Sequence, residues 1–200
     1  MTDENARHAE KKRKFKTAHD KIVAAKTVEK GLLIVHTGTG KGKSTAAFGM
    51  AMRAVAHGMK VGVVQFIKGT WESGERAVLE RFPDQVEIHA HGEGFTWETQ
   101  DRERDIASNR AAWAKAKEFL ADPACGMVIL DELNIALRYD YLDLDEVLAA
   151  LAARPPGQHA IVTGRNAKDA LIEAADLVTE MTLIKHPFRA GVKAQKGIEF

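Results

Sequence analysis

The sequence predicts an α/β fold in which a mostly parallel β-sheet is covered by α-helices on both faces. Short apolar runs alternate with amphipathic segments from Gly31 onward, and continuous apolar runs are typical of parallel strands that are buried on both faces. A glycine-rich turn joins the first apolar run to the first helical segment, and a later apolar run ends in two acidic residues. With 200 residues, the chain is long enough for one domain with a sizeable core.

The composition is that of an ordinary soluble globular protein, with 45% apolar and 28% charged residues. A formal net charge of +1 argues against a nucleic-acid binder that depends on bulk positive charge. The single cysteine, Cys125, cannot form an internal disulfide, and no apolar run approaches the ~20 residues of a membrane span. The charged N-terminus lacks the apolar stretch of a secretory signal. We therefore expect a cytoplasmic protein that binds neither nucleic acid nor membrane.

Residues 1–30 differ from residues 31–200, which form the predicted α/β domain. The first segment contains no glycine and no proline, and nine lysines and arginines against five acids give it a formal charge of +4. Phe15, Ala18, Ile22 and Ala25 recur in it at helical spacing. Two interpretations stay open, a disordered basic tail or a helix that folds when a ligand is present.

In residues 31–200 the apolar periodicity predicts alternating strands and helices. Gly58, Pro123 and Pro155-Pro156 provide helix stops. The predicted strands are Leu32–His36, Lys60–Phe66, Val86–Ala90, Met127–Asp131, Ala160–Thr163 and Leu177–Leu183. The predicted helices are Lys43–His57, Ser73–Arg81, Thr99–Ala121, Leu144–Arg154 and Ala167–Ala174.

Residues 37–44, Thr-Gly-Thr-Gly-Lys-Gly-Lys-Ser, predict a phosphate-binding P-loop between the first strand and the first helix. Gly42, Lys43 and Ser44 satisfy the end of the motif, whereas Thr37 stands where its first glycine is expected. Backbone N–H groups and the helix N-terminus would face the phosphates. Lys43 would neutralise phosphate charge, and Ser44 would place its hydroxyl on Mg²⁺. Lys41 is either a second phosphate contact or a lysine that faces solvent.

The apolar run Met127–Leu130 ends in Asp131 and Glu132, as in the strand that carries the metal-binding acids of P-loop proteins. A buried strand presents such acids at the edge of the sheet where open α/β folds bind ligands. One carboxylate can hold Mg²⁺ directly or through water. In an ATPase, the other could polarise a water molecule.

A third candidate feature is the glycine-containing stretch that holds Phe95 and Trp97. These aromatic residues lie outside the periodic segments, so they either line a pocket for a flat apolar ligand or fold over the core.

Two weaker features could also belong either to a binding site or to the surface. His89-x-His91 has a metal-binding spacing but no third ligand, and Thr163-Gly164-Arg165 could place a guanidinium near phosphate or on the surface.

These motifs together resemble one family, the ATP:corrinoid adenosyltransferases of the BtuR/CobO/CobA type. The resemblance runs from about Gly31 to the C-terminus, in order and at family-like spacing. It rests on residues 37–45, Val64-Gln65-Phe66-Ile67-Lys68-Gly69, Gly94-Phe95-Thr96-Trp97, Asp131-Glu132-Leu133-Asn134, Thr163-Gly164-Arg165 and His186-Pro187-Phe188.

The resemblance implies a homodimeric α/β P-loop fold of the RecA-like kind. It implies transfer of the 5′-deoxyadenosyl group of ATP to the cobalt of a reduced corrinoid, with release of triphosphate and with an electron-donor reductase as partner. The family also holds ATP in the opposite sense to ordinary P-loop hydrolases. The alternative from the P-loop alone is an ATPase or kinase, and a nucleotide-binding regulatory module without turnover is a third reading.

The resemblance also implies roles for individual residues. Ser44 and Glu132 would hold Mg²⁺ or Mn²⁺, with Asp131 in support. Phe95 and Trp97 would pack against the corrinoid and keep a lower axial ligand off the cobalt, and residues 1–30 would be a mobile lid over it. Lys41 and Lys43 would neutralise the leaving triphosphate. The implied nucleotide-binding residues are Gly38, Thr39, Gly40, Lys41, Gly42, Lys43, Ser44, Thr45, Arg53 and Arg165.

We expect Phe95→His to slow the adenosylation of a corrinoid that is supplied as cobalt(II). An apolar ring offers the cobalt no ligand and excludes water, whereas imidazole offers a donor that makes reduction to cobalt(I) harder. Rates with cobalt(II) and with chemically reduced cobalt(I) corrinoid would be compared. Unchanged turnover with cobalt(II) would remove Phe95 from the site.

Overall fold

The computed structural model describes residues 2–67, 73–90 and 101–199. The chain divides into two compact units, Met1–Lys30 and Gly31–Phe200. Phe95 and Trp97 lie outside the described residues.

The first unit consists of helix α1 (Thr2–Ala24) and an irregular stretch that ends at Lys30. An ion pair one helical turn apart, Lys14 to Glu10 at 2.8 Å, supports the helix. The side chains from residue 4 onward are exposed, including Phe15 at 70% and Ile22 at 60%. The segment that the sequence left open between a tail and a helix is therefore helical, and its apolar stripe is exposed within this unit.

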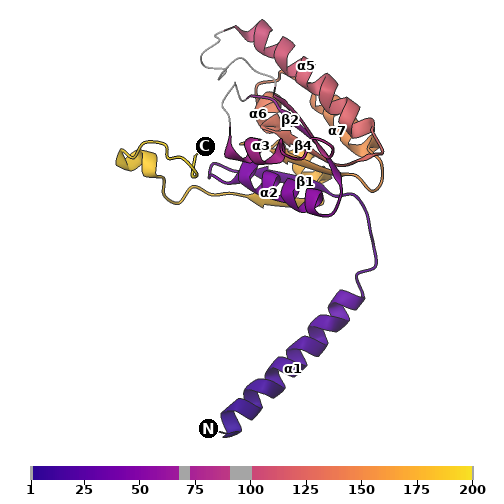
Figure 1. Ribbon diagram of the computed structural model, residues 1–200, viewed down its shortest axis with the longest axis vertical. Helices are drawn as coiled ribbons and strands as arrows, with labels where there is room; N and C mark the ends of the chain where they lie inside the picture. Colours follow the sequence, from indigo (N-terminus) through magenta and orange to yellow (C-terminus); the bar gives the residue numbers. More distant parts are fainter. Residues whose placement is uncertain (1, 68–72, 91–100, 200) are drawn as a thin grey trace. The chain divides into compact units, whose positions relative to one another are not determined.

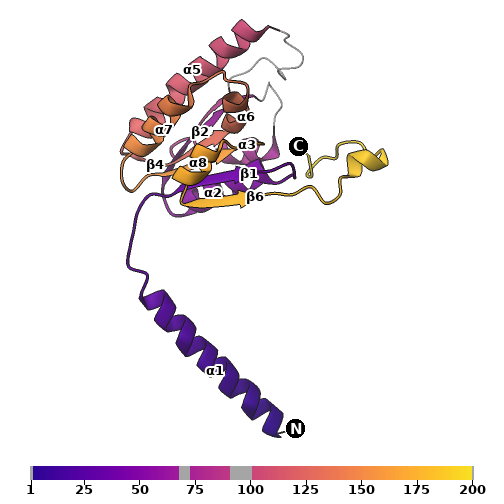
Figure 2. The ribbon, with the colours of Figure 1, turned by 180° about the vertical axis from the view of Figure 1, so that it is seen from behind.

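The second unit is built on a β-sheet (Figures 1 and 2). Its described strands are parallel and follow the order β3-β2-β4-β5-β1-β6. Because all these strands are parallel, their carboxyl ends meet at one edge of the sheet. One strand, β5, separates the loop after β1 from the loop after β4. The bounds are β1 Leu33–Thr37, β2 Lys60–Gln65, β3 Val86–Ala90, β4 Cys125–Asp131, β5 His159–Thr163 and β6 Leu177–Glu180.

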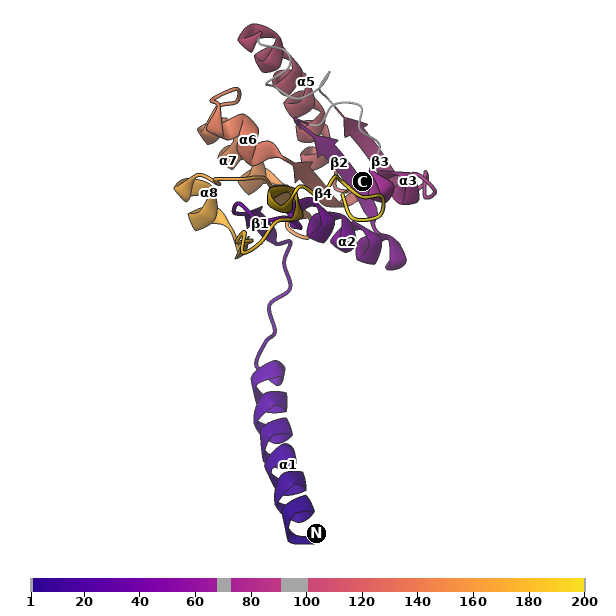
Figure 3. The same cartoon turned by 90° about the vertical axis from the view of Figure 1, so that its left-hand side faces the viewer.

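Helices cover both faces of the sheet (Figure 3). On one face lie α2 (Lys43–Ala56) and α3 (Gly74–Leu79), and on the other lie α5 (Arg102–Ala121), α6 (Leu133–Arg138), α7 (Leu144–Ala153) and α8 (Asp169–Ala174). A short 3₁₀ helix, η1 (Pro187–Ala190), follows β6. Among the described helices, none combines the length and apolar character that crossing a bilayer requires. The fold confirms the predicted three-layer α/β architecture.

The predicted strands and helices are present, with shifted ends. The strand β6 ends at Glu180 rather than at Leu183. The pairing with β1 ends there, because Glu180 lies opposite Thr37, the last residue of β1, and the N–H of Met181 closes the ladder by donating to the carbonyl of Thr37 at 2.9 Å. The helix α5 begins at Arg102, whereas its predicted start, Thr99, lies outside the described residues. The sequence does not predict α6 or η1, which are a single turn or two in length.

The face of the sheet under α2 turns from apolar to polar at the carboxyl ends of its central strands. On β4, Ile129 packs with the α2 cluster and Leu130 with the cluster on the other face, so Asp131 returns to the α2 side. The same alternation places a buried polar residue at or next to the carboxyl end of each of four central strands, on the α2 side. These residues are His36 on β1, Gln65 on β2, Asp131 on β4 and Thr163 on β5.

Among these four residues, His36 differs because its side chain makes no hydrogen bond to the described residues. The residue is 5% exposed, and both ring nitrogens are buried without a partner among the described residues. Burial lowers the pKa of the imidazole below its usual 6.5, because a charged ring would lose its hydration there. The imidazole is therefore neutral in the folded chain at neutral pH.

We expect His36→Phe to raise the free energy of unfolding, and to raise it more as the pH falls. The unfolded imidazole takes up a proton near pH 6.5, whereas the folded one takes it up only at lower pH, so the wild type loses stability as pH falls from 6.5 through the folded pKa. Removing two unsatisfied nitrogens should add about 1–3 kcal/mol even at neutral pH. Urea unfolding of both proteins between pH 8 and pH 5 measures the difference.

The exposed His57 gives the matched control. His57→Phe adds the same ring at an exposed position, so an equal gain in the free energy of unfolding by both variants would mean that the burial of His36 is not its cause. A stability difference between His36→Phe and the wild type that stays constant over this pH range would contradict the assignment of a depressed pKa to His36.

Candidate functional site

The loop after β1 is shaped by glycines that meet the chain leaving β6. Gly38 and Gly42 have positive φ angles of 95° and 104°, which disfavour residues with a Cβ atom. A Cβ on Gly38 would lie 2.5 Å from the carbonyl oxygen of Met181, and one on Gly40 would lie 2.7 Å from it. The N–H of Gly40 donates to that same oxygen at 2.6 Å. The glycines therefore allow the loop to dock closely on the backbone beyond β6.

Thr37, at the position of the missing first glycine, has a structural task of its own. It is 7% exposed, and its Oγ1 accepts a hydrogen bond from the backbone N–H of Ala167 at 3.1 Å. Thr37 is not among the described residues with positive φ. The departure from the standard motif thus ties the start of the loop to the segment after β5, and the rest of the loop keeps its glycines.

Helix α2 begins directly after the loop with its amide end uncapped. Its N-cap is Gly42, whose lack of a side chain leaves the first N–H groups without a side-chain acceptor. By contrast, Ser73, Asp101 and Asp143 cap α3, α5 and α7 with side-chain oxygens. The free amide end of α2 attracts anions.

Lys43, the first residue of α2, is a buried cation that bends back over the loop. It is 6% exposed, and its Nζ donates to the carbonyl oxygen of Gly40 at 2.5 Å. Burial lowers its pKa, as do the neighbouring charges of Arg165 and Lys41, while Glu132 and Asp131 act in the opposite direction. An anion placed on the loop would offset these effects, so the position suits a phosphate group.

The two acids at the end of β4 differ in exposure. Asp131 is fully buried, with its Oδ2 accepting from Gln65 Nε2 at 3.0 Å and its Oδ1 accepting from Thr163 Oγ1 at 2.8 Å. Glu132 lines the cavity beside Ser44, and its φ angle of 64° is in the left-handed region. Glu132 is therefore the acid that faces the cavity, whereas Asp131 is not among the residues that line it.

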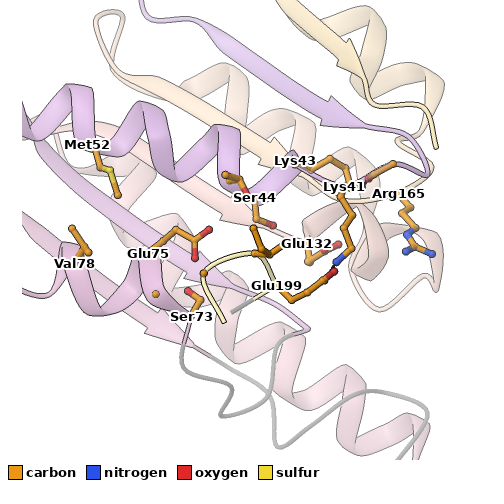
Figure 4. A pocket seen from close by; sticks show the side chains of 16 residues that line it. Lys41, Lys43, Ser44, Met52, Ser73, Glu75, Val78, Glu132, Arg165 and Glu199 are labelled. Atoms are coloured by element: carbon orange, nitrogen blue, oxygen red, sulfur yellow. Dashed lines mark hydrogen bonds and ion pairs between the residues drawn. The ribbon is translucent and has the colours of Figure 1, made fainter. Parts of the chain in front are cut away.

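A cavity of about 560 Å³ lies over the loop and extends between α2 and α3 (Figure 4). This volume is within the range of small-molecule sites. Figure 4 shows Met52, Glu75 and Val78 at one end and Arg165 at the other, with Ser44 and Glu132 between them. The lining residues are Gly40, Lys41, Gly42, Lys43, Ser44, Thr45, Met52, Ser73, Gly74, Glu75, Val78, Glu132, Arg165, Gly197, Ile198 and Glu199.

Most of the residues predicted from the sequence come together at this cavity, but not all of them. Gly38 shapes the loop without lining the cavity, and Thr39 is exposed on the loop. Arg53 lies in the last turn of α2, is exposed, and is absent from the described lining. Arg165 lines the cavity. His89 lies on β3, where its Nε2 is 2.7 Å from Glu87 Oε1, while His91 is outside the described residues.

The structure adds residues that belong to none of the sequence motifs. Met52 could have been found by helical spacing, because it lies seven residues after Thr45 on the same side of α2. No sequence signal marks Glu75 or Val78 on α3. Glu199 enters from the other end of the unit and pairs with the Nζ of Lys41.

Comparisons with known proteins agree with the geometry of this site. The sequence profile of the ATP:corrinoid adenosyltransferase family BtuR/CobO/CobP matches residues 29–200. A corrinoid adenosyltransferase of Pseudomonas aeruginosa is 59% identical, over 99% of this chain and 98% of its own. One of a Sinorhizobium species is 60% identical, over 98% and 93%. The corrinoid adenosyltransferase CobA of Salmonella typhimurium is 52% identical over the whole of both chains.

The P-loop, the acids at the end of β4 and the cavity between them therefore lie in a chain that belongs to the ATP:corrinoid adenosyltransferase family.

Proposed function

We propose that this chain transfers the 5′-deoxyadenosyl group of ATP to the cobalt(I) of a reduced corrinoid and releases triphosphate, in the synthesis or salvage of adenosylcobalamin. The observation that carries the proposal is the cavity on the P-loop. Three cationic side chains, Lys41, Lys43 and Arg165, line it together with the acid Glu132, in a chain that belongs to this family.

The reaction makes one bond and breaks one bond. The electron pair of cobalt(I) attacks the 5′-carbon of ATP, a cobalt–carbon bond forms, and the carbon–oxygen bond breaks, so that its electron pair leaves on triphosphate. No proton has to move, and the protein needs no general base. Its contributions are orientation of the two substrates and stabilisation of the charge that develops on the leaving oxygen.

Lys41 and Lys43 supply this charge stabilisation in the proposal. Lys43 is held over the loop by the carbonyl of Gly40, so its ammonium is in place before the nucleotide arrives. Burial and nearby cations lower the pKa of Lys43, and phosphate oxygens would relieve that effect. The same residues that bind ATP through its phosphates thus bind the leaving group more tightly as its charge grows.

The donors at the cavity suit a magnesium ion that arrives with ATP. Ser44 and Glu132 offer a hydroxyl and a carboxylate to the same space, and Mg²⁺ prefers oxygen ligands, often one or two carboxylates with substrate phosphates. Within the described ranges, no three His, Cys, Asp or Glu residues form a metal site by themselves, so phosphate oxygens and water would complete the shell. When bound, Mg²⁺ or Mn²⁺ neutralises phosphate charge.

The nucleoside would occupy the end of the cavity between α2 and α3. Met52 and Val78 flank this end and are both 40% exposed, so their apolar surface is open to a purine ring. Glu75 and Ser73 add a carboxylate and a hydroxyl that can bond to the ribose or the base.

The corrinoid would approach at the same edge of the sheet. Phe95 and Trp97 follow the carboxyl end of β3, which ends at Ala90, and they would cover the lower face of the cobalt. We further propose that residues 1–30 close over the corrinoid, that the chain acts as a cytoplasmic homodimer, and that a reductase supplies the electron.

The proposal predicts the product of the reaction. The chain with ATP, Mg²⁺ and chemically reduced corrinoid should form a light-sensitive cobalt–carbon bond and release one triphosphate for each bond. Visible absorbance before and after illumination measures the corrinoid, and anion-exchange chromatography identifies the phosphate product.

Lys43→Ala is the control for this assay, because losing the buried cation should remove most of the activity. Release of ADP and phosphate in place of triphosphate would refute the proposal in favour of a P-loop ATPase or kinase.

A further inference from the structure

Thr163 joins the carboxyl ends of β4 and β5 through a single hydroxyl group. The residue is fully buried. Its Oγ1 donates to Asp131 Oδ1 at 2.8 Å and accepts from the backbone N–H of Glu132 at 2.9 Å. A hydroxyl has one proton to donate. Because that proton is directed to Asp131, a lone pair of the oxygen is left to face Glu132.

Glu132 has a backbone conformation that needs support. Its φ angle of 64° is in the left-handed region, which is disfavoured for a residue with a Cβ atom. Glu132 is the N-cap of α6, yet its side chain makes no capping hydrogen bond. The carboxylate instead lines the cavity beside Ser44. Strained backbone of this kind persists where the surroundings hold it, commonly at a functional site.

The turn after β5 also leaves room for this conformation. Gly164 has a φ angle of 123°, and a Cβ on it would lie 3.1 Å from Glu132 Oε2 and 2.9 Å from the Cβ of Asn134. Asn134 Nδ2 in turn donates to the carbonyl oxygen of Gly164 at 3.0 Å. The ends of β4 and β5 are thus joined by side-chain hydrogen bonds on both sides of Glu132.

We propose that Thr163 is a positioning residue, whose hydroxyl holds the backbone of Glu132 so that its carboxylate reaches the metal–nucleotide complex. Asp131 orients the hydroxyl, and Gln65 holds the other oxygen of Asp131. The inference rests on the proposed role of Glu132 as a ligand of the metal that arrives with ATP. It assigns Asp131 to the support of Thr163 and not to the metal.

Thr163→Val and Thr163→Ser separate the hydroxyl from the shape of the side chain. Valine keeps the branched shape and loses the hydroxyl, whereas serine keeps the hydroxyl. Mn²⁺ binding in the presence of ATP and without corrinoid would be measured from the EPR signal of free Mn²⁺. Losing a hydrogen bond that orients a metal ligand typically costs 10–100-fold in metal affinity, so we expect at least about a tenfold loss for Thr163→Val and little change for Thr163→Ser.

Binding of ATP in EDTA distinguishes positioning from general damage to the fold. We expect Thr163→Val to bind metal-free ATP within about twofold of the wild type, because the P-loop contacts remain. Equal Mn²⁺ affinity of the Val and Ser variants would overturn the proposal, and so would equal losses with and without metal.

Two further variants, at Asp131 and Glu132, test the same link from its other members. If Thr163→Val does not fold, Asp131→Asn tests the same link, since it removes the charged acceptor that orients the hydroxyl, and it should also weaken Mn²⁺. Glu132→Gln should weaken Mn²⁺ at least as much. If it does not, the metal role of Glu132 fails and the Thr163 proposal fails with it, whereas triphosphate release by the wild type tests the overall function separately.

The end of the chain also reaches the cavity. The segment after β6 runs out to η1 and turns back toward the sheet (Figure 1). Gly197, Ile198 and Glu199 line the cavity, and a turn in which the N–H of Glu199 donates to the carbonyl of Gln195 at 2.9 Å presents the glutamate. The side chain of Glu199 is 16% exposed and pairs with Lys41 (Figure 4).

We infer that Glu199 sets the affinity for nucleotide by competing for Lys41. Its carboxylate pairs with the ammonium group that would bind a triphosphate. The carboxylate and the triphosphate, both negatively charged, would repel each other at this one cation. Nucleotide binding is therefore weaker while Glu199 stays paired with Lys41.

Glu199→Gln keeps the shape of the side chain and removes its charge. We expect it to bind metal-free ATP more tightly, by up to about fivefold for a partly exposed pair, with the gain shrinking as salt is raised. Glu173→Gln, at an exposed position on α8, is the control for net charge and should leave the affinity unchanged. Unchanged or weaker binding by Glu199→Gln, or equal tightening by both variants, would overturn the inference.

Discussion

The carboxyl group of Asp131 has no exposed surface, and the carboxyl edge of the sheet is arranged around satisfying it. Burying such a group is costly unless it has hydrogen-bond donors. Its donors are Gln65 and Thr163, which come from the two strands that flank β4. The position of Glu132 follows, because the hydroxyl that satisfies Asp131 also accepts the N–H of the next residue. One buried group thereby couples three strands to the acid that faces the cavity.

A second constraint is the concentration of positive charge over the P-loop. Lys43 is buried with its pKa lowered, and Lys41 and Arg165 are close enough to contribute to that shift. The carbonyl of Gly40 accepts a hydrogen bond from Lys43, and the acid Glu199 pairs with Lys41. Such an arrangement suits a polyanion. It also suits a reaction in which the polyanion is the leaving group, since the attraction grows as the bond to carbon breaks.

The glycines and Thr37 of the loop serve packing as much as phosphate binding. Gly38 and Gly40 lie against the backbone of Met181, and Thr37 binds the segment after β5. The loop is thus held by the segments that follow both neighbours of β1, the strands β5 and β6. These contacts fix the position of the amide end of α2 relative to the ammonium of Lys43. This explains why the motif can lose its first glycine and still form a phosphate-binding loop.

Local spacing in the sequence was sufficient for the fold class, the P-loop and the pair Asp131-Glu132, because periodicity and glycine position act over a few residues. The resemblance of these motifs to a family added the reaction. Spacing could not show that Gln65 and Thr163 both bind Asp131. It also could not show that Met52 and Val78 line the same cavity, or that Glu199 pairs with Lys41. Those contacts depend on which strands are neighbours and on how a distant segment returns to the sheet. Only the tertiary structure decided them, since hydrogen bonds and ion pairs join groups by distance in space and not by their separation along the chain.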